Sequence, residues 1–191
     1  MPYTREHKEN TRTKILESAF RLFTMKGFDS ITVNMVMNEC GLTRGAFYAH
    51  FSSKSNLYGE ALKLGANRTN LAKLKPESTS DKEWLCLLLD GYLSLEHVQG
   101  KTPCPLAFLA TDIVTRDKET KAIYASVYDG MNKAIIAYAR SHIDCDEHDI
   151  LSLTAMIIGA VAIARTMSDT NAVIDLLAAC RREAGLKLGG I

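Results

Sequence analysis

Apolar side chains recur at helical spacing along almost the whole chain of 191 residues. Between Glu9 and Lys26, for example, Ile15, Leu16 and Ala19 begin a series at i, i+1, i+4, i+5 and i+8 that lies on one face of a helix. No stretch of useful length alternates apolar and polar residues as a half-buried strand does. The pattern therefore predicts an all-α fold.

Residues that start and stop helices divide this pattern into about nine helices. Gly27 and Gly41 are suited to end helices, because glycine readily adopts a positive φ. Thr32, Thr43 and Ser53 are suited to begin them, because a side-chain hydroxyl can accept a hydrogen bond from a free backbone N–H group. The expected helices cover residues 9–26, 33–40, 44–50, 54–74, 81–97, 105–115, 118–141, 148–167 and 171–184.

A connector rich in helix breakers, KPESTS at residues 75–80, separates two parts of unlike charge. Residues 1–75 carry twelve Lys or Arg against six Asp or Glu, whereas residues 76–191 carry eleven against sixteen. A basic amino-terminal part followed by an acidic part favours a module that binds a polyanion, joined to a second module with another function. Chance clustering of charged residues gives the same charge balance. We therefore expect a head over 1–52, a connecting helix over 53–75 and a body over 76–191.

Residues 32–51, TVNMVMNECGLTRGAFYAHF, have the layout of a helix-turn-helix. A short amphipathic helix meets a tight turn at Cys40-Gly41-Leu42, and a second short helix follows. Such a pair exposes the first residues of its second helix, and an α-helix fits the major groove of B-DNA. The layout therefore indicates double-stranded DNA as a partner.

Three details of the second helix and its surroundings favour DNA binding over mere helix packing. Inside a helix, Gly45 is about 1 kcal/mol less favourable than Ala. The missing side chain is useful if a phosphate or a base edge must approach the backbone. Arg44, Tyr48 and His50 cluster as hydrogen-bond donors for bases and phosphates. Lys54 lies in the first turn of the helix over 54–74, where a cation is unfavourable with respect to the helix dipole by about 0.3–1 kcal/mol. A phosphate bound at the same N-terminus would explain this choice of residue. The alternatives are a tolerated glycine, a half-buried Tyr48 and a locally packed His50.

With the stretches ILESAFRLF, KGFDSITV and CGLTRGAFYAHFSSKSNLYGEAL, the chain resembles the tetracycline-repressor (TetR) family from about Thr11 through Leu62. The resemblance implies a three-helix DNA-binding head and a homodimer that reads a pseudo-palindromic operator. It implies that base edges or the groove are faced by Thr43, Arg44, Gly45 and Ala49. It implies that phosphates are held by Thr32, Tyr48, His50 and Lys54, and that packing positions are filled by Leu42, Phe47 and Phe51.

After residue 75 the resemblance is weaker and implies only the architecture, a helical body with a ligand cavity and a two-helix dimer interface. The longest uncharged stretch, Ile150 to Ala164, is shorter than the roughly 20 residues of a membrane span, so we expect a buried helix and no membrane contact. A helix that is apolar all round needs cover on every side, which favours a partner chain over a fully buried helix in a monomer. The expected dimer interface comprises Leu153, Ile157, Gly159, Ala160, Ala164, Val173 and Leu177.

An effector cavity in the body would be walled by the helices over 81–97, 105–115 and 118–141. Its candidate lining residues, which an ordinary core would equally require, are Trp84, Leu88, Tyr92, Phe108, Tyr124, Tyr128 and Met131. Cys104 lies at the cap position before Pro105, where the positive end of a helix dipole can favour a reactive thiolate. The unknown effector is therefore a small molecule or an electrophile, and the alternative for Cys104 is an inert residue beside a turn.

No feature of the sequence indicates an enzyme, a cofactor or a metal. The chain has no Gly-rich phosphate loop, no GxSxG motif and no His/Cys cluster at metal-ligand spacing. A polar start and five cysteines without a CxxC pair favour reduced thiols in the cytoplasm. The predicted function is a ligand- or stress-responsive transcriptional regulator, by default a repressor released from its operator by an effector. A helical protein-interaction adaptor without DNA binding is the alternative.

Overall fold

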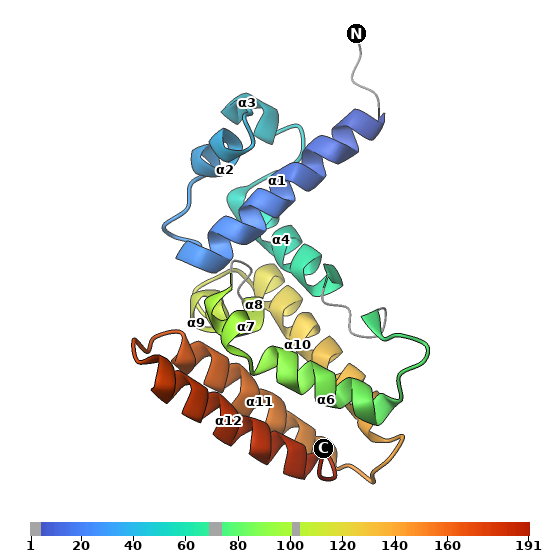
Figure 1. Cartoon of the computed structure of the whole chain (residues 1–191). Helices are drawn as coiled ribbons and strands as arrows, with labels where there is room; N and C mark the ends of the chain where they lie inside the picture. Colours follow the sequence, from blue (N-terminus) through green and yellow to red (C-terminus); the bar gives the residue numbers. More distant parts are fainter. Residues whose placement is uncertain (1–4, 69–73, 101–103) are drawn as a thin grey trace. The chain divides into compact units, whose positions relative to one another are not determined.

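The computed structural model describes residues 5–68, 74–100 and 104–191 (Figure 1). These residues form eleven helices and contain no strand, so the prediction of an all-α fold is confirmed. They gather into two compact units. The first unit holds the described residues of 5–68 and 108–127, and the second holds those of 74–100, 104–107 and 128–191.

The first unit is built on α1, which packs along α4 and against α2, while α2 packs on α3. Its helices are α1 (Arg5–Lys26), α2 (Val33–Glu39), α3 (Arg44–Phe47), α4 (Lys54–Arg68), α9 (Ala110–Ile113) and the first part of α10 (Lys118–Ala139). The apolar stripe predicted for α1 forms its core, because Ile15, Ala19 and Phe23 are almost completely buried. Phe23 meets Tyr58 of α4 edge to face, with ring centroids 4.9 Å apart.

The helix ends of this unit follow the local chemistry of the sequence. The Thr32 hydroxyl accepts a hydrogen bond from the Met35 N–H group at 3.2 Å, and the Ser53 hydroxyl accepts one from Asn56 at 3.0 Å, so both predicted caps are confirmed. Gly27 and Gly41 follow α1 and α2 with φ of +76° and +68°, the left-handed region that glycine alone enters without strain. These ends fix the lengths of the helices that form the head.

The second unit is a bundle in which α11 and α12 lie side by side as an antiparallel pair and α12 packs on α6 and α7 (Figure 1). Its helices are α6 (Asp81–Tyr92), α7 (Leu95–Gln99), most of α8 (Pro105–Phe108), the second part of α10, α11 (Glu147–Ala164) and α12 (Thr170–Lys187). Leu85 and Leu89 of α6 are buried, as are Ile157 of α11 and Leu177 of α12. Leu85 and Leu89 belong to the apolar repeat of the sequence, whereas Ile157 and Leu177 were expected at a dimer interface and are buried in the core of this unit instead.

Two predicted helices are each divided in the structure, which is why the described residues form eleven helices. The helix expected over 81–97 breaks at Leu93, and Ser94 starts α7 by accepting a hydrogen bond from the N–H group of His97 at 3.0 Å. The helix expected over 105–115 breaks at Leu109 into α8 and α9. The predicted end of the helix over 54–74 and the loop before Cys104 lie partly outside the described residues.

The segment 108–127 differs from the domain division expected from the sequence, which placed all of 76–191 in one body. It clusters with the first unit because Leu109 and Ile113 are buried in the same apolar core as α1 and α4. Ile123 and Tyr124 of α10 pack against that core as well. The amino-terminal unit therefore includes a segment that lies far from it in the sequence.

Helix α11 is long and apolar enough, by length and composition alone, to cross a membrane, with a mean hydropathy of 1.5 over 18 residues. Seven of its residues, among them Ile150, Leu153 and Val161, are buried in the second unit, whereas Leu151 and Ile163 are exposed. The alternative of a helix fully buried within a monomer is therefore wrong, because only one face of α11 is buried. The other face is apolar and uncovered in the single chain.

Candidate nucleic-acid interface

The turn between α2 and α3 is set by backbone hydrogen bonds. The N–H group of Leu42 donates to the carbonyl of Met37 at 2.9 Å, and that of Gly41 donates to Asn38 at 3.0 Å, which is the Schellman pattern of a helix end. Phe47 is completely buried and anchors α3 to the core. The sequence thus builds a helix-turn-helix whose second helix has one anchored side and one outward side.

The outward side of α3 is open. Thr43, Arg44 and Ala49 are exposed, and the side chain of Thr43 makes no capping hydrogen bond. At Gly45, the only atom within 4 Å of the place that a Cβ would occupy is the Thr43 hydroxyl, at 3.9 Å. Tyr48 is 60 % exposed although its ring meets that of Phe47, so the half-buried packing role does not apply. The structure brings these five residues together around one short helix.

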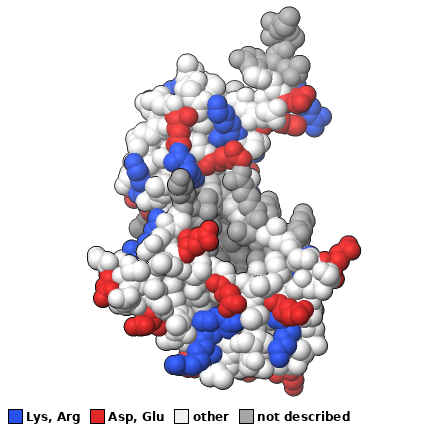
Figure 2. Space-filling view, viewed as in Figure 1, with Lys and Arg blue, Asp and Glu red and all other residues white. Residues whose placement is uncertain are grey.

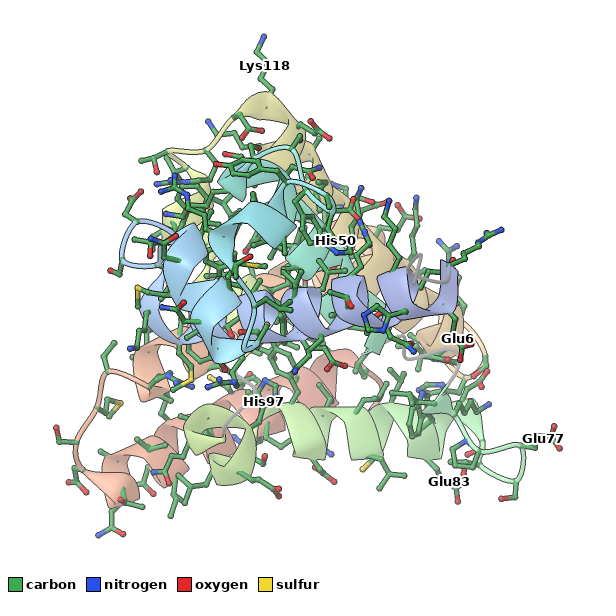
Figure 3. The ribbon with its side chains drawn as sticks, turned by 90° about the horizontal axis from the view of Figure 1, so that it is seen from above. Glu6, His50, Glu77, Glu83, His97 and Lys118 are labelled. Atoms are coloured by element: carbon green, nitrogen blue, oxygen red, sulfur yellow. The ribbon has the colours of Figure 1, made fainter. Side chains whose placement is uncertain are left out.

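His50 is half-buried beside α1 (Figure 3). Its Nδ1 atom is buried and has no hydrogen-bond partner among the described residues. Burial lowers the pKa of the imidazole, and the positive charges of Lys8 and Arg12 lower it further. The ring is therefore held in its neutral form, able to donate one hydrogen bond to a phosphate.

Lys54 begins α4 as predicted, but its ammonium group does not simply project into solvent. The Nζ atom lies 4.0 Å from the centroid of the Phe28 ring, a cation–π contact that the sequence did not indicate. Burial lowers the pKa of Lys54, and the nearby carboxylate of Asp29 opposes this shift. The position of this cation thus depends on the loop that carries Phe28.

The same loop is held by Asp112 of α9. Its Oδ2 atom accepts a hydrogen bond from the N–H group of Phe28 at 3.0 Å and another from the hydroxyl of Tyr58 at 2.8 Å. Burial and this hydrogen bond raise the pKa of Tyr58, so the phenol remains a donor. One carboxylate oxygen therefore joins the loop before α2 and the helix α4.

Arg116 completes this anchor from the turn before α10. Its guanidinium makes two hydrogen bonds to the carboxylate of Asp29, at 3.1 and 2.9 Å, and lies 4.3 Å from the centroid of the Phe28 ring. The hydrogen bonds from Arg116 lower the pKa of Asp29. We call Phe28, Asp29, Tyr58, Asp112 and Arg116 the loop anchor. Sequence reasoning missed it, and the only local signal is the Asp-to-Arg spacing of four in TDIVTRD.

Charge on the visible face of the head is mixed. Lys or Arg and Asp or Glu side chains alternate over the amino-terminal helices in the view of Figure 2. The net positive balance of the first 75 residues is therefore not spread as a uniform basic sheet over this face. On this face, individual cations rather than a continuous basic surface are available to phosphates.

The residues expected to line an effector cavity are divided between the two units. Trp84, Tyr92 and Tyr128 belong to the second unit, whereas Phe108 and Tyr124 belong to the first. The hydroxyl of Tyr128 lies 3.0 Å from that of Thr154, and Tyr92 and His97 have ring centroids 4.9 Å apart. The buried nitrogen atoms Trp84 Nε1 and His97 Nε2 have no hydrogen-bond partner among the described residues.

Cys104 precedes α8 as expected, but its environment does not favour a thiolate. The thiol is 7 % exposed, and burial raises its pKa, although the hydroxyl of Tyr92 at 3.2 Å and the N–H groups of Leu106 and Ala107 oppose this shift. Desolvation disfavours the charged form more than these donors favour it. The prediction of a reactive Cys104 is therefore wrong in its physical basis.

The expected dimer interface also needs correction. Nearly all of its members are buried within the chain itself: Leu153, Ile157, Ala160, Ala164, Val173 and Leu177. Only Gly159 opens to space, with nothing within 4 Å of a Cβ placed there. The uncovered apolar side chains of the same two helices are Leu151, Ile163, Ile174 and Leu186, which are 44–64 % exposed.

Comparison with known proteins assigns this architecture. A family model described as bacterial regulatory proteins of the tetR family matches residues 15–61, which include the helix-turn-helix. This amino-terminal segment is therefore similar to regulatory proteins of the TetR family. An uncharacterized HTH-type transcriptional regulator of this kind, YfiR of Bacillus subtilis (strain 168), is 29 % identical over 131 residues. The match covers 66 % of this chain and 62 % of YfiR, so it spans less than two thirds of that relative.

Solved structures of TetR-type regulators share the fold over nearly the whole chain. Escherichia coli NemR in its reduced form superposes with a TM-score of 0.80 at 13 % identity, covering 92 % of this chain and 95 % of that one. A transcriptional regulator from Saccharomonospora viridis, solved in complex with choline, gives a TM-score of 0.70 at 22 % identity, covering 90 % and 94 %. The likeness extends the TetR fold beyond the head to the helical body.

Proposed function

We propose that this chain is a DNA-binding transcriptional regulator of the TetR family that binds a pseudo-palindromic operator as a homodimer. The observation that carries the proposal is the open outward side of α3, where Thr43, Arg44, Gly45 and Tyr48 are exposed together. A core helix would bury this side, and a helix packed on another part of the chain would fill the space at Gly45. A helix presented in this way has the shape that the major groove accepts.

The exposed residues divide by chemistry into base readers and phosphate holders. Arg44 can donate two hydrogen bonds to guanine, and the small side chains at Gly45 and Ala49 allow close approach to the bases. Thr43 lies at the start of the helix, where base edges are nearest. The proposed phosphate contacts are Thr32, Tyr48, His50 and Lys54. In this division α3 supplies sequence preference, and its surroundings supply orientation.

A second copy of the chain would cover the exposed apolar face of α11 and α12. This face carries Leu151, Ile163, Ile174 and Leu186, which are exposed in the single chain. A two-fold contact of such a pair makes a four-helix interface and presents two heads. Two heads match two half-sites, which is how dimeric helix-turn-helix proteins read palindromic operators.

The second unit would bind the effector. The structural relative from Saccharomonospora viridis holds choline, which supports a small molecule rather than an electrophile. The partnerless Trp84 Nε1 and His97 Nε2 are atoms that such a ligand could satisfy. Binding would release DNA if the ligand prefers a conformation in which the head no longer fits the operator. Repression relieved by an effector, in the cytoplasm, is therefore the proposed default.

Substitution of Gly45 tests the DNA interface. Gly45→Trp places a large side chain where the groove must approach, while little in the chain itself opposes it. We expect operator affinity to fall to the level of non-specific binding, about 10³-fold or more. Fluorescence anisotropy on a duplex selected from random DNA measures this loss, and thermal unfolding checks the fold.

The matched control is Gly91→Trp, because Gly91 is also a helical glycine with open space around it. It should bind the selected duplex like the unmodified chain. If Gly45→Trp binds equally well, α3 is not the reading helix. If the unmodified chain binds no duplex in a salt-dependent manner, the adaptor function replaces the regulator.

A further inference from the structure

The first turns of α1 carry cations that lie outside the stretch matched by the family model. Arg5, Lys8 and Arg12 precede residue 15, where that match begins. Lys8 and Arg12 are four residues apart and therefore share one face of the helix. Arg5 pairs with Glu9 of the same helix at 3.1 Å, and Arg12 pairs with Glu60 of α4 at 3.0 Å.

This face of α1 meets the end of the helix-turn-helix. The guanidinium of Arg12 lies 4.9 Å from the centroid of the Phe51 ring and bonds to Glu60 of α4 at 3.0 Å. Lys8 and Arg12 are both close enough to His50 for their charges to act on its ring. Figure 3 shows His50 beside α1. Three basic groups from two separate segments thus gather next to the outward side of α3.

The like charges of Lys8 and Arg12, four residues apart on one helix, repel each other in the chain alone. Glu60 is shared between Arg12 and Lys63, and Lys8 has no carboxylate partner within the part of the chain that the structure describes. A cation near the start of a helix also opposes the helix dipole. An anion bound at this place would offset both costs. An anion that runs alongside α3 is the backbone of the DNA that α3 enters.

We propose that Lys8 and Arg12 of α1, together with His50, bind backbone phosphates beside the bases read by α3, so that the DNA interface extends to the first turns of α1. The inference rests on the proposed function, since it needs a duplex on α3. Its basis is the complementary charge of this patch and its continuity with the exposed residues of α3. We call Lys8, Arg12 and His50 the α1 patch.

Phosphate contacts have a signature that separates them from base contacts. Each neutralised phosphate releases counterions, so the slope of log K against log salt changes by about 0.9 per contact. A phosphate contact also affects all sequences alike, because it carries no base information. Loss of Lys8 should therefore reduce the salt slope without changing the preference for the operator.

The experiment uses the full chain with Lys8→Gln, which removes one exposed charge and little packing. Lys26→Gln, at the other end of the same helix, is the matched control. Because each protomer of the proposed dimer loses one contact, we expect the affinity loss over a fourfold rise in salt to shrink by about 12-fold for Lys8→Gln, for operator and random duplexes equally. Lys26→Gln should keep the slope of the unmodified chain.

Replacement of single phosphates by neutral methylphosphonates then locates the contact. At least one replacement should weaken binding of the unmodified chain and leave binding of Lys8→Gln unchanged. An unaltered salt slope in Lys8→Gln, with no phosphate coupled to Lys8, overturns the α1 patch while the loss in Gly45→Trp still supports the regulator. Absence of duplex binding by the unmodified chain overturns both proposals.

Discussion

At the scale of single residues, His97 connects burial to the pH dependence of stability. Its ring packs on Tyr92, its Nε2 atom has no partner among the described residues, and burial lowers its pKa. In the unfolded chain the imidazole returns to its ordinary pKa of about 6.5. Between the lowered and the ordinary value the unfolded chain binds more protons than the folded one. The free energy of unfolding therefore falls as the pH falls through this window.

Replacing His97 should make stability less sensitive to acid. Urea unfolding of His97→Gln and His97→Phe between pH 7 and pH 5 should show a smaller decrease in the free energy of unfolding than the unmodified chain. Some decrease remains, because the pKa of His50 is lowered as well. A packing defect would lower the free energy of unfolding equally at every pH, whereas loss of the His97 titration changes how steeply this free energy depends on pH. An unchanged slope in both variants would contradict the assignment to His97.

Residues that act on their immediate neighbours could be predicted from the sequence. Thr32 and Ser53 cap helices, and Gly41 ends one, through contacts with residues at most five positions away. The cation–π contact of Lys54 with Phe28 could not be predicted, because it depends on how a loop folds back over α4. The chemistry of Cys104 was misjudged because burial, which a local pattern does not show, outweighs its position before a helix.

At the scale of elements, Asp112 fixes the loop before α2 to α4. Asp112→Ala would leave the N–H group of Phe28 and the hydroxyl of Tyr58 without an acceptor. We expect the free energy of unfolding to fall by about 1–3 kcal/mol, because buried donors lose their partner. Hydrogen exchange should show faster exchange of the Phe28 amide.

Asp129→Ala is the matched control for this substitution. Asp129 forms an exposed ion pair with Lys133 at 2.7 Å, and an ion pair on the surface contributes little to stability. Its removal should leave exchange of the Phe28 amide unchanged. Equal effects of the two variants on stability and exchange would show that the loop anchor does not hold the loop.

The contacts of the loop anchor could not be predicted from the sequence pattern of the individual helices. Asp112 and Phe28 are 84 positions apart, and nothing in their surroundings signals that they meet. Apolar periodicity found the helices of the segment 108–127 but not the unit to which they belong. The breaks at Leu93 and Leu109 escaped notice because the apolar repeat continues through them.

At the scale of the whole molecule, the uncovered face of α11 and α12 sets the expected oligomeric state. Ile163→Asp places a charge at a side chain that is 55 % exposed in the single chain. Burial of that charge in a dimer would be costly, so the variant should be monomeric where the unmodified chain is dimeric. Light scattering at micromolar concentration measures the difference.

Val114→Asp is the control for this prediction, since Val114 is a similarly exposed aliphatic residue of the other unit. It should leave the molar mass unchanged. A monomeric unmodified chain would remove the basis for reading two half-sites.

Sequence periodicity placed the proposed interface on α11 and α12 but selected side chains that the chain buries. Leu153, Ile157 and Leu177 were chosen as interface residues because they are apolar at helical spacing, yet the chain buries them in its own core. A helix that is apolar all round offers no pattern that separates the inner face from the outer one. The packing of α11 on α12 and α7, and of α12 on α6 and α7, makes that distinction.

The backbone turn at Gly41 has a consequence for how such a protein could acquire new targets. Its two hydrogen bonds involve main-chain atoms, so the orientation of α3 does not depend on the side chains that are proposed to contact the bases. Thr43, Arg44 and Ala49 can consequently be randomised together without altering the scaffold. A library at these three positions offers a route to retarget the protein to another promoter.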